Sequence, residues 1–270
     1  MILSLFRHLW GVTEPWETVF PKIKEKDYQG IECPVPVKGD RDRLLNLLQQ
    51  YDFRFIAQIF TEGKTPGEHL VSFRQQLEEA AACNPVLVNC HSGRDSFSEP
   101  ESVEFMSKAL ELERTMGVPV AHETHRGRIL YNPWITERLL TKFEDLKLCC
   151  DYSHWVCVCE RLLDDVPEII QRCARHAIHV HARVGYEEGP QVPDPRAPEY
   201  RRHLEAHERW WRMVWESQKQ RGWKESTLTP EFGPPDYMHT LPHTYAPVSD
   251  LWQICDWQAD RQRDHFSRMA

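Results

Sequence analysis

The 270-residue chain lacks both a long apolar run and an excess of positive charge. No stretch approaches the roughly 18 consecutive apolar residues of a membrane helix. Lys and Arg number 33 against 41 Asp and Glu, and the formal net charge is −8. A chain this acidic has no broad basic surface of the kind that non-specific nucleic-acid binding requires. We therefore expect neither a membrane protein nor a nucleic-acid partner.

The chain also lacks the cysteine spacings of metal fingers and disulfide scaffolds. Its nine cysteines are an odd number, and none forms a CxxC pair. Disulfides are rare in the cytoplasm, so we expect reduced, partly buried thiols and a cytoplasmic protein. The apolar start of the chain has no basic segment before it and is broken by Arg7 and His8, so we expect a first strand there and no signal peptide.

Short apolar segments alternate with amphipathic segments along the whole chain. The expected strands cover residues 2–9, 30–34, 53–60, 85–90, 118–123, 146–151, 177–182 and 226–231. From the second to the seventh, the strand ends follow one another at intervals of about 30 residues, which is the length of a βα unit. Eight such units account for nearly the entire chain. The sequence therefore predicts an α/β fold, a single (β/α)8 TIM barrel that forms one domain over residues 1–270.

Helix-start signals support this alternation. Ser98-Glu-Pro-Glu101 has the form of a capping box, and Asn132-Pro133 and Asp165-Val-Pro167 are typical of the first turn of a helix. The competing α/β fold is a doubly wound open sheet. That fold usually carries a glycine-rich phosphate loop after its first strand, and Arg7-His-Leu-Trp-Gly11 has no such pattern.

Two segments after the seventh strand depart from the regular spacing. Residues 185–198 are polar and rich in proline, and we predict an extended loop that closes over bound substrate at the barrel mouth. The long helix that follows carries the stripe Trp210-Trp211-Met213-Val214-Trp215. This stripe is either part of the core or a subunit interface, and in the second case the protein is a homo-oligomer.

Acidic and imidazole side chains stand at the expected ends of the last four strands, at Glu123, Asp151, His181 and Glu231. The carboxyl ends of the strands of such a barrel meet at one mouth, where the chemistry of these proteins takes place. Three acids and one imidazole at one mouth would repel one another unless a cation lay between them. This mixture of oxygen and nitrogen ligands suits one divalent ion: Mn²⁺, Mg²⁺, Co²⁺ or Zn²⁺.

Further residues near the strand ends are candidates for substrate binding. His154 comes three residues after Asp151, so both side chains can reach the same mouth. His91 ends the fourth strand, Arg183 follows the seventh, and Trp155 can stack on the apolar face of a sugar. We predict that His154, Arg183, His91 and Trp155 contact the substrate. Each also has a structural alternative, as a loop cap, an ion-pair partner or a packing residue.

The order Glu123, Asp151-x-x-His154, His181, Glu231 resembles the xylose isomerase-like TIM barrel superfamily, the sugar phosphate isomerase/epimerase family. The resemblance extends over essentially the whole chain. It implies that these four residues hold the metal, that Glu123 and Glu231 also act as acid and base, and that His154 contacts substrate. It also implies a small-molecule carbohydrate substrate. The chemistry agrees, because two carboxylates can move a proton beside a carbonyl while a metal ion stabilises the enediolate.

The sequence leaves two other activities open. A lyase or dehydratase acting on a keto-sugar or an inosose would use the same metal and the same base. An endonuclease IV-like phosphodiesterase needs three metal ions and therefore more ligands. The third strand reads Ile56-Ala-Gln-Ile59 where that branch has a histidine, and Asp194-Pro-Arg196 lacks the histidine of its Asp-x-His pair. We therefore expect an isomerase or epimerase, with the lyase as the alternative.

Overall fold

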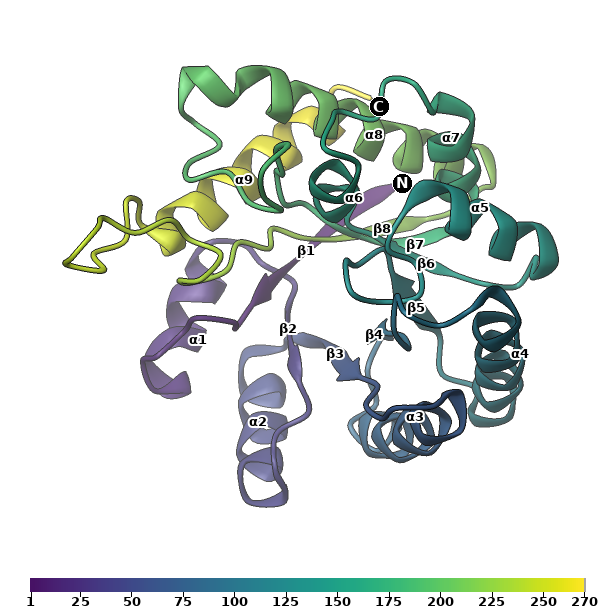
Figure 1. Cartoon of the computed structure of the whole chain (residues 1–270). Helices are drawn as coiled ribbons and strands as arrows, with labels where there is room; N and C mark the ends of the chain where they lie inside the picture. The colour runs from purple at the N-terminus through teal and green to yellow at the C-terminus, as the bar shows by residue number, and fades with distance from the viewer. Residues whose placement is uncertain (270) are drawn as a thin grey trace.

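A computed structural model describes residues 1–269, and it contains a closed barrel of eight parallel strands surrounded by helices (Figure 1). The strands are β1 (Ile2–His8), β2 (Gly30–Pro34), β3 (Arg54–Phe60), β4 (Leu87–His91), β5 (Val120–Glu123), β6 (Leu148–Cys150), β7 (Ala177–His181) and β8 (Glu225–Thr229). Each strand pairs in parallel with the next, and β8 pairs with β1 to close the ring. The predicted (β/α)8 barrel is confirmed.

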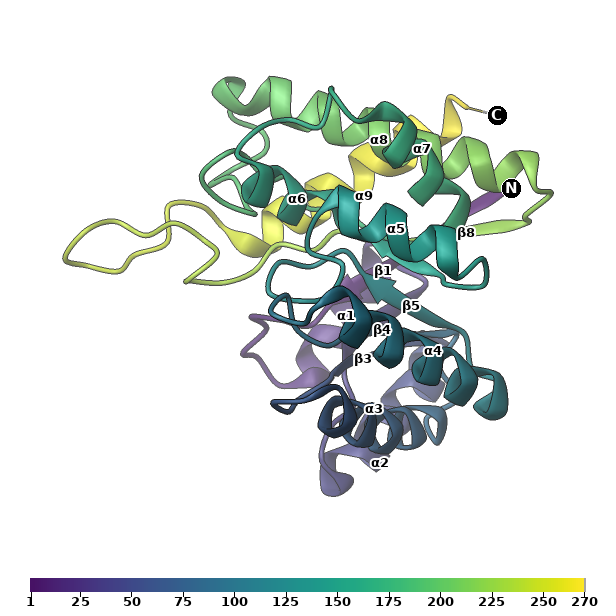
Figure 2. The same ribbon diagram turned by 45° about the vertical axis from the view of Figure 1, so that its right-hand side comes forward.

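Helices follow the strands on the outside of the barrel (Figures 1 and 2). They are α1 (Trp16–Glu25), α2 (Lys38–Tyr51), α3 (Pro66–Ala81), α4 (Glu99–Met116), α5 (Pro133–Lys142), α6 (Tyr152–Cys159), α7 (Pro167–His176), the short 3-10 helix η1 (Pro198–Tyr200), α8 (Arg201–Gln220) and α9 (Leu251–Ser267). The capping box at Ser98 forms as predicted, and Asn132 caps α5. The sequence patterns did not single out α1 or α6.

The main core lies between the barrel and its helices, where α3 and α4 contribute Phe73 and Phe105. The aromatic stripe of α8 belongs to this core: Trp211 and Trp215 are fully buried, and Trp210 is nearly so. Replacing a buried aromatic residue of this kind by alanine costs about 3–5 kcal/mol of stability. The three tryptophans of the stripe are therefore core, and the homo-oligomer stays a prediction.

The interior of the barrel changes from apolar to polar toward the mouth. A small apolar group fills part of the interior and consists of Phe6, Ile56, Leu87, Ala121 and Cys149. Two residues further along β3, β4 and β5, the side chains are Gln58, Asn89 and Glu123, which are buried and polar. Side chains two apart on a strand share one face, so this step places the polar groups directly above the apolar ones. The alternation of side chains along the strands thus places polar groups at the mouth.

Two long connections flank the mouth. Residues 185–198 form the predicted loop after β7, and its Gln191 exchanges two hydrogen bonds with the backbone of Gly233. Much of this loop is buried, and its closing over substrate stays a prediction. The connection between β8 and α9, residues 230–250, extends away from the barrel as the yellow-green segment of Figures 1 and 2. The sequence spacing gave no sign of this second excursion.

Two further expectations can be compared with the structure. All nine cysteines are free, and seven of them are buried, as expected for reduced thiols. Within residues 1–269, no helix combines the length and the apolar character needed to cross a membrane.

Candidate metal centre

The four predicted metal ligands come together at the carboxyl ends of neighbouring strands. Glu123 and His181 are the last residues of β5 and β7, and Glu231 comes two residues after β8. Asp151 directly follows β6 and is the N-cap of α6, where its Oδ1 accepts a hydrogen bond from the Ser153 amide at 3.0 Å. One potential ligand atom from each of the four lies within 4.8 Å of the other three, and all four side chains are buried.

Three buried atoms of this group have no hydrogen-bond partner within residues 1–269: Glu123 Oε1, His181 Nδ1 and Glu231 Oε2. Glu231 Oε2 lies 2.9 Å from His181 Nδ1, but the geometry is not that of a hydrogen bond. Leaving a buried polar atom unpaired costs about 1–3 kcal/mol, and more when it is charged. These converging oxygen and nitrogen atoms lack hydrogen bonds, although Glu231 Oε2 lies beside the Arg183 guanidinium. They are donor atoms of the kind that bind a divalent cation, so these residues fit a metal ion.

Arg183 is a second source of positive charge in this group. Its Nη2 lies 2.5 Å from Asp151 Oδ2 and 2.9 Å from Glu231 Oε2, and the guanidinium is almost fully buried. Burial raises the pKa of Asp151, and Arg183 opposes that shift. Burial also favours a raised pKa for Glu231, but Arg183 and His181 outweigh it and hold that pKa well below its usual range. Arg183 therefore keeps part of the acidic cluster ionised.

Glu32 from β2 contacts the predicted histidine ligand, a contact that the sequence did not reveal. Its Oε1 lies 2.8 Å from His181 Nε2, and its Oε2 lies 3.2 Å from His179 Nε2. Burial would raise the pKa of Glu32, but the two histidines lower it well below its usual range, so it is an ionised acceptor. An ionised carboxylate only accepts, so Nε2 of His181 carries the proton. In a neutral His181, the lone pair on Nδ1 then faces the other ligands.

Glu123 is held from its other side by β4. Its Oε2 accepts from Asn89 Nδ2 at 2.6 Å and lies 2.8 Å from His91 Nε2, whereas its buried Oε1 has no hydrogen-bond partner among residues 1–269. Burial would raise the pKa of Glu123, but His91 and His181 lower it. His91 and His125 form a second potential ligand group with Glu123. In this structure Oε2 of Glu123 already contacts His91 and Asn89.

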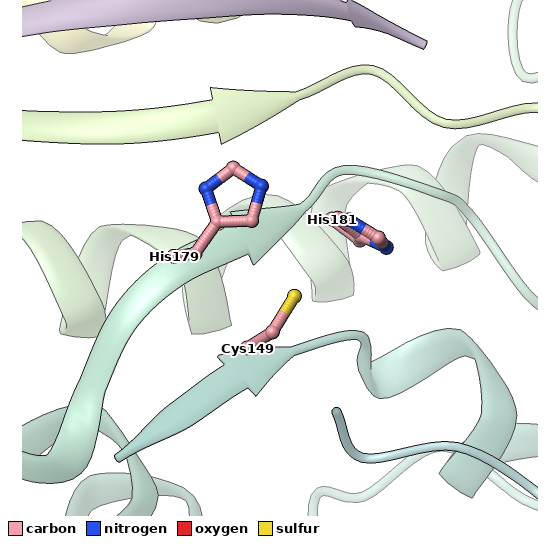
Figure 3. A group of neighbouring side chains, drawn as sticks. All are labelled: Cys149, His179 and His181. Carbon is pink, nitrogen blue, oxygen red and sulfur yellow. The ribbon is translucent and has the colours of Figure 1, made fainter. Parts of the chain in front are cut away.

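A third group of potential ligands, Cys149, His179 and His181, lies inside the barrel, where Cys149 of β6 points toward the two histidines of β7 (Figure 3). Both nitrogens of His179 already have partners, because Nδ1 lies 2.8 Å from Thr227 Oγ1 and Nε2 contacts Glu32. Burial raises the pKa of the Cys149 thiol well above its usual range, so the thiol stays protonated. This group shares His181 with the four predicted ligands. As predicted, His179 is a barrel-filling neighbour of the ligands.

A cavity of about 520 Å³ opens beside the metal group. Among the predicted substrate-binding residues, His91 and Arg183 line it. His154 is fully buried and does not line it; its ring packs against His125, which does, with 3.8 Å between the ring centroids. The cavity also receives Tyr237 from the connection after β8, which the strand-end pattern could not place.

Trp155 does not take the predicted position at the mouth. The chain enters α6 directly after Asp151, and this turn places Trp155 on the buried face of the helix with no exposed surface. Its indole N–H donates to the carbonyl of Leu130 at 2.8 Å. Trp155 therefore packs in the core of this structure and does not line the cavity, and its contact with substrate stays a prediction without support from this position.

The chain belongs to the xylose isomerase-like TIM barrel family, whose sequence model matches residues 20–208. This match confirms the resemblance seen in the strand-end motif. No curated protein matches the sequence significantly.

Solved structures from the same fold group cover nearly the whole chain. D-psicose 3-epimerase from Clostridium cellulolyticum H10 is 12% identical, with 100% of this chain and 99% of that chain covered and a TM-score of 0.61. A probable 3-DHS dehydratase from Bacillus anthracis is 12% identical, with 97% and 98% covered and a TM-score of 0.62. A xylose isomerase-like TIM barrel protein from Mycobacterium smegmatis, in complex with magnesium, is 10% identical, with 97% and 95% covered and a TM-score of 0.67. At these identities the similarity shows the fold.

Proposed function

We propose that this protein is a divalent-metal-dependent isomerase or epimerase that moves a proton beside the carbonyl of a keto-sugar or keto-polyol. The observation that carries the proposal is the buried group of Glu123, Asp151, His181 and Glu231 at the mouth, next to a cavity. Its composition suits Mn²⁺, Mg²⁺, Co²⁺ or Zn²⁺. The partner would be a small carbohydrate in the cytoplasm and neither nucleic acid nor a membrane.

In this mechanism the protein's own residues position the substrate and move the proton. A divalent ion bound here would supply Lewis acidity, polarising the carbonyl and stabilising the negative charge of the enediolate. Glu231, which lines the cavity, would take the proton from the carbon beside the carbonyl. Glu123, which comes from β5 on another side of the mouth, would return one to the opposite face. Arg183 and His91 would hold substrate oxygens.

Hydrogen exchange tests this proposal directly. Protein loaded with Mn²⁺ is incubated in D₂O with a panel of keto-sugars, and we expect deuterium at the carbon beside the carbonyl for at least one of them. Glu231→Gln should keep much of its metal, because the amide oxygen still coordinates, yet lose exchange by roughly 100-fold or more. Glu225→Gln is the matched control, since Glu225 starts β8, the strand that leads to Glu231, and pairs with Arg54 away from the mouth.

Exchange at the wild-type rate in metal-loaded Glu231→Gln would show that the base lies elsewhere, and His154 would be the next candidate. No exchange with any keto-sugar by the metal-loaded wild type would refute the proposed reaction. Metal content must be measured on each sample by elemental analysis.

The second candidate is a lyase that eliminates water next to the carbonyl. The imidazoles of His91 and His125 both line the cavity, and their ring centroids are 4.2 Å apart. One of these imidazoles would act as the general acid that protonates a leaving hydroxyl. Elimination would give an unsaturated ketone that absorbs in the ultraviolet, which an epimerase does not form.

A phosphodiesterase has less support. Gln58 stands among the cavity residues on β3, where the nuclease branch has a histidine, and Asp194 is engaged in a 2.7 Å ion pair with Arg196. Two of the further ligands of a three-metal site therefore lack a counterpart within residues 1–269.

A further inference from the structure

The cavity next to the metal group has two chemically different sides. The metal ligands come from β5–β8. Across the barrel mouth, the segments after β1 and β2, the end of β3 and the connection after β8 contribute a wall of apolar and aromatic side chains: Trp10, Trp16, Val35, Pro36, Phe60 and Tyr237. Each of these six side chains is only partly buried, so part of its surface faces the open cavity. We call these six residues the aromatic wall.

The aromatic wall is held in place by its own contacts. The rings of Trp10 and Tyr237 meet edge to face, with 4.8 Å between their centroids, and the Trp10 ring lies directly against Gly233. The guanidinium of Arg183 lies 5.0 Å from the Tyr237 ring. These contacts hold Trp10 and Tyr237 at the edge of the wall that adjoins Arg183 and the polar group.

The cavity offers little to a phosphate group. Among the described residues that line it, Arg183 is the single Arg or Lys, and its Nη2 is already shared between Asp151 and Glu231. Arg126 lies 5.1 Å from the Tyr237 ring but does not line the cavity. A phosphate would also approach several buried carboxylates, and in a site of low dielectric that repulsion is strong. Phosphate sites normally present free cations or backbone N–H groups instead.

We propose that the aromatic wall is a subsite for an uncharged ring attached to the substrate, so that the protein acts on an unphosphorylated sugar derivative that carries an aryl group or a second sugar ring. Aromatic side chains bind such rings by stacking and by burying apolar surface. A volume of about 520 Å³ falls in the range of roughly 300–1,000 Å³ that holds drug-sized ligands. The keto-sugar part of this inference rests on the proposed function, whereas the subsite itself does not.

Binding of three unreactive probes tests the subsite without relying on the chemistry. Calorimetry on the Mn²⁺-loaded protein compares D-glucose, phenyl β-D-glucoside and D-glucose 6-phosphate, none of which carries the ketone that the proposed reaction needs. We expect phenyl β-D-glucoside to bind about tenfold tighter than glucose, which corresponds to about 1.4 kcal/mol. Glucose 6-phosphate should bind no tighter than glucose. Tighter binding of the phosphate than of the phenyl glucoside would overturn the proposal.

Two variants locate the effect on the wall. Trp16→Ala removes a ring from it, and Val35→Asp places a charge in it without removing an aromatic side chain. Both should abolish the preference for the phenyl glucoside while metal content and circular dichroism stay unchanged. Trp134→Ala is the control, because Trp134 is an exposed tryptophan on α5 outside the cavity. If both folded wall variants keep the preference, the wall is not the subsite.

The same samples separate this inference from the proposed function. A preference for the phenyl glucoside without deuterium exchange on any keto-sugar would leave the subsite standing and refute the proposed reaction. Exchange with simple keto-sugars but no preference for the phenyl glucoside would support the proposed reaction and refute the subsite.

Discussion

Nε2 of His181 lies 2.8 Å from Oε1 of Glu32, and this contact turns the other ring nitrogen toward Glu231. The two residues come from β7 and β2, which are not neighbours in the barrel. Carboxylates that accept from the second nitrogen of a metal-binding histidine fix its tautomer and increase its basicity. Glu32 is therefore a positioning residue for the candidate metal centre, and the first prediction follows from it.

Glu32→Gln should weaken metal binding by roughly 10–100-fold, the range seen when such supporting partners are lost. The amide has nearly the same shape, so the barrel should fold, but it carries no charge to hold the proton on Nε2. Affinity is measured by competition with a chelator. Glu113→Gln is the control, because it changes an acid that pairs with His122 on the outer face of the barrel. Equal affinities of Glu32→Gln and wild type would contradict the positioning role.

Asp151→Asn should purify with strongly reduced metal, by roughly tenfold or more, because a charged ligand becomes neutral. The asparagine can still cap α6 through its side-chain oxygen, so the helix should remain. Elemental analysis gives the metal content, and circular dichroism checks the fold. Asp194→Asn serves as control, since Asp194 pairs with Arg196 outside the metal group. A metal content equal to that of the wild type would remove Asp151 from the ligand set.

Gln191→Ala should loosen the loop of residues 185–198. It would leave the backbone N–H and carbonyl of Gly233 without their buried partners, which costs about 1–3 kcal/mol per group. Urea unfolding measures the loss of stability. Gly233 comes two residues after Glu231, so turnover should fall as well. Gln75→Ala on the exposed face of α3 is the control. If Gln191→Ala lowers the free energy of unfolding no more than this control does, Gln191 does not hold the loop.

The buried pair of His122 and Glu113 should make stability depend on pH. Burial by itself would lower the pKa of His122, but Glu113, 2.8 Å away, outweighs it and raises this pKa to about 10. A pKa above the unfolded value of about 6.5 means that the stabilisation is complete below pH 6.5 and is lost as the pH rises toward 10.

The free energies of unfolding of wild type and Glu113→Gln should therefore differ most near pH 6. The difference should shrink with rising pH by up to about 1.4 kcal/mol per pH unit. Urea unfolding at pH 6, 7.5 and 9 measures it. Glu104→Gln, which disrupts an exposed pair with Lys108, should show almost no such trend. A difference between wild type and Glu113→Gln that stays constant with pH would mean that His122 is not charged in the folded protein.

The strand-end acids could be predicted because they depend on local pattern and on one general rule. The repeat of about 30 residues locates each strand, and parallel strands in a closed barrel must bring their carboxyl ends to the same mouth. Glu123, Asp151 and His181 needed no further information. Glu231 lies two residues beyond β8 and still joins the group.

Trp155 shows what this reasoning does not determine. Its distance from Asp151 in the sequence placed it near the mouth, but the direction of its side chain depends on where α6 begins. Since Asp151 itself caps that helix, Trp155 turns into the core. A strand-end rule gives the position of a residue along the chain and not the face of the next element on which it lies.

The sequence by itself determined the barrel and the four potential ligands, because periodic burial and strand order act through short stretches of chain. Only the tertiary structure decided that Glu32 supports His181, that Arg183 lies between Asp151 and Glu231, and that Tyr237 closes one side of the cavity. These relationships join strands and loops far apart in the chain. Their partners are chosen by the register of the closed barrel and by the path of the long connections, which no local pattern encodes.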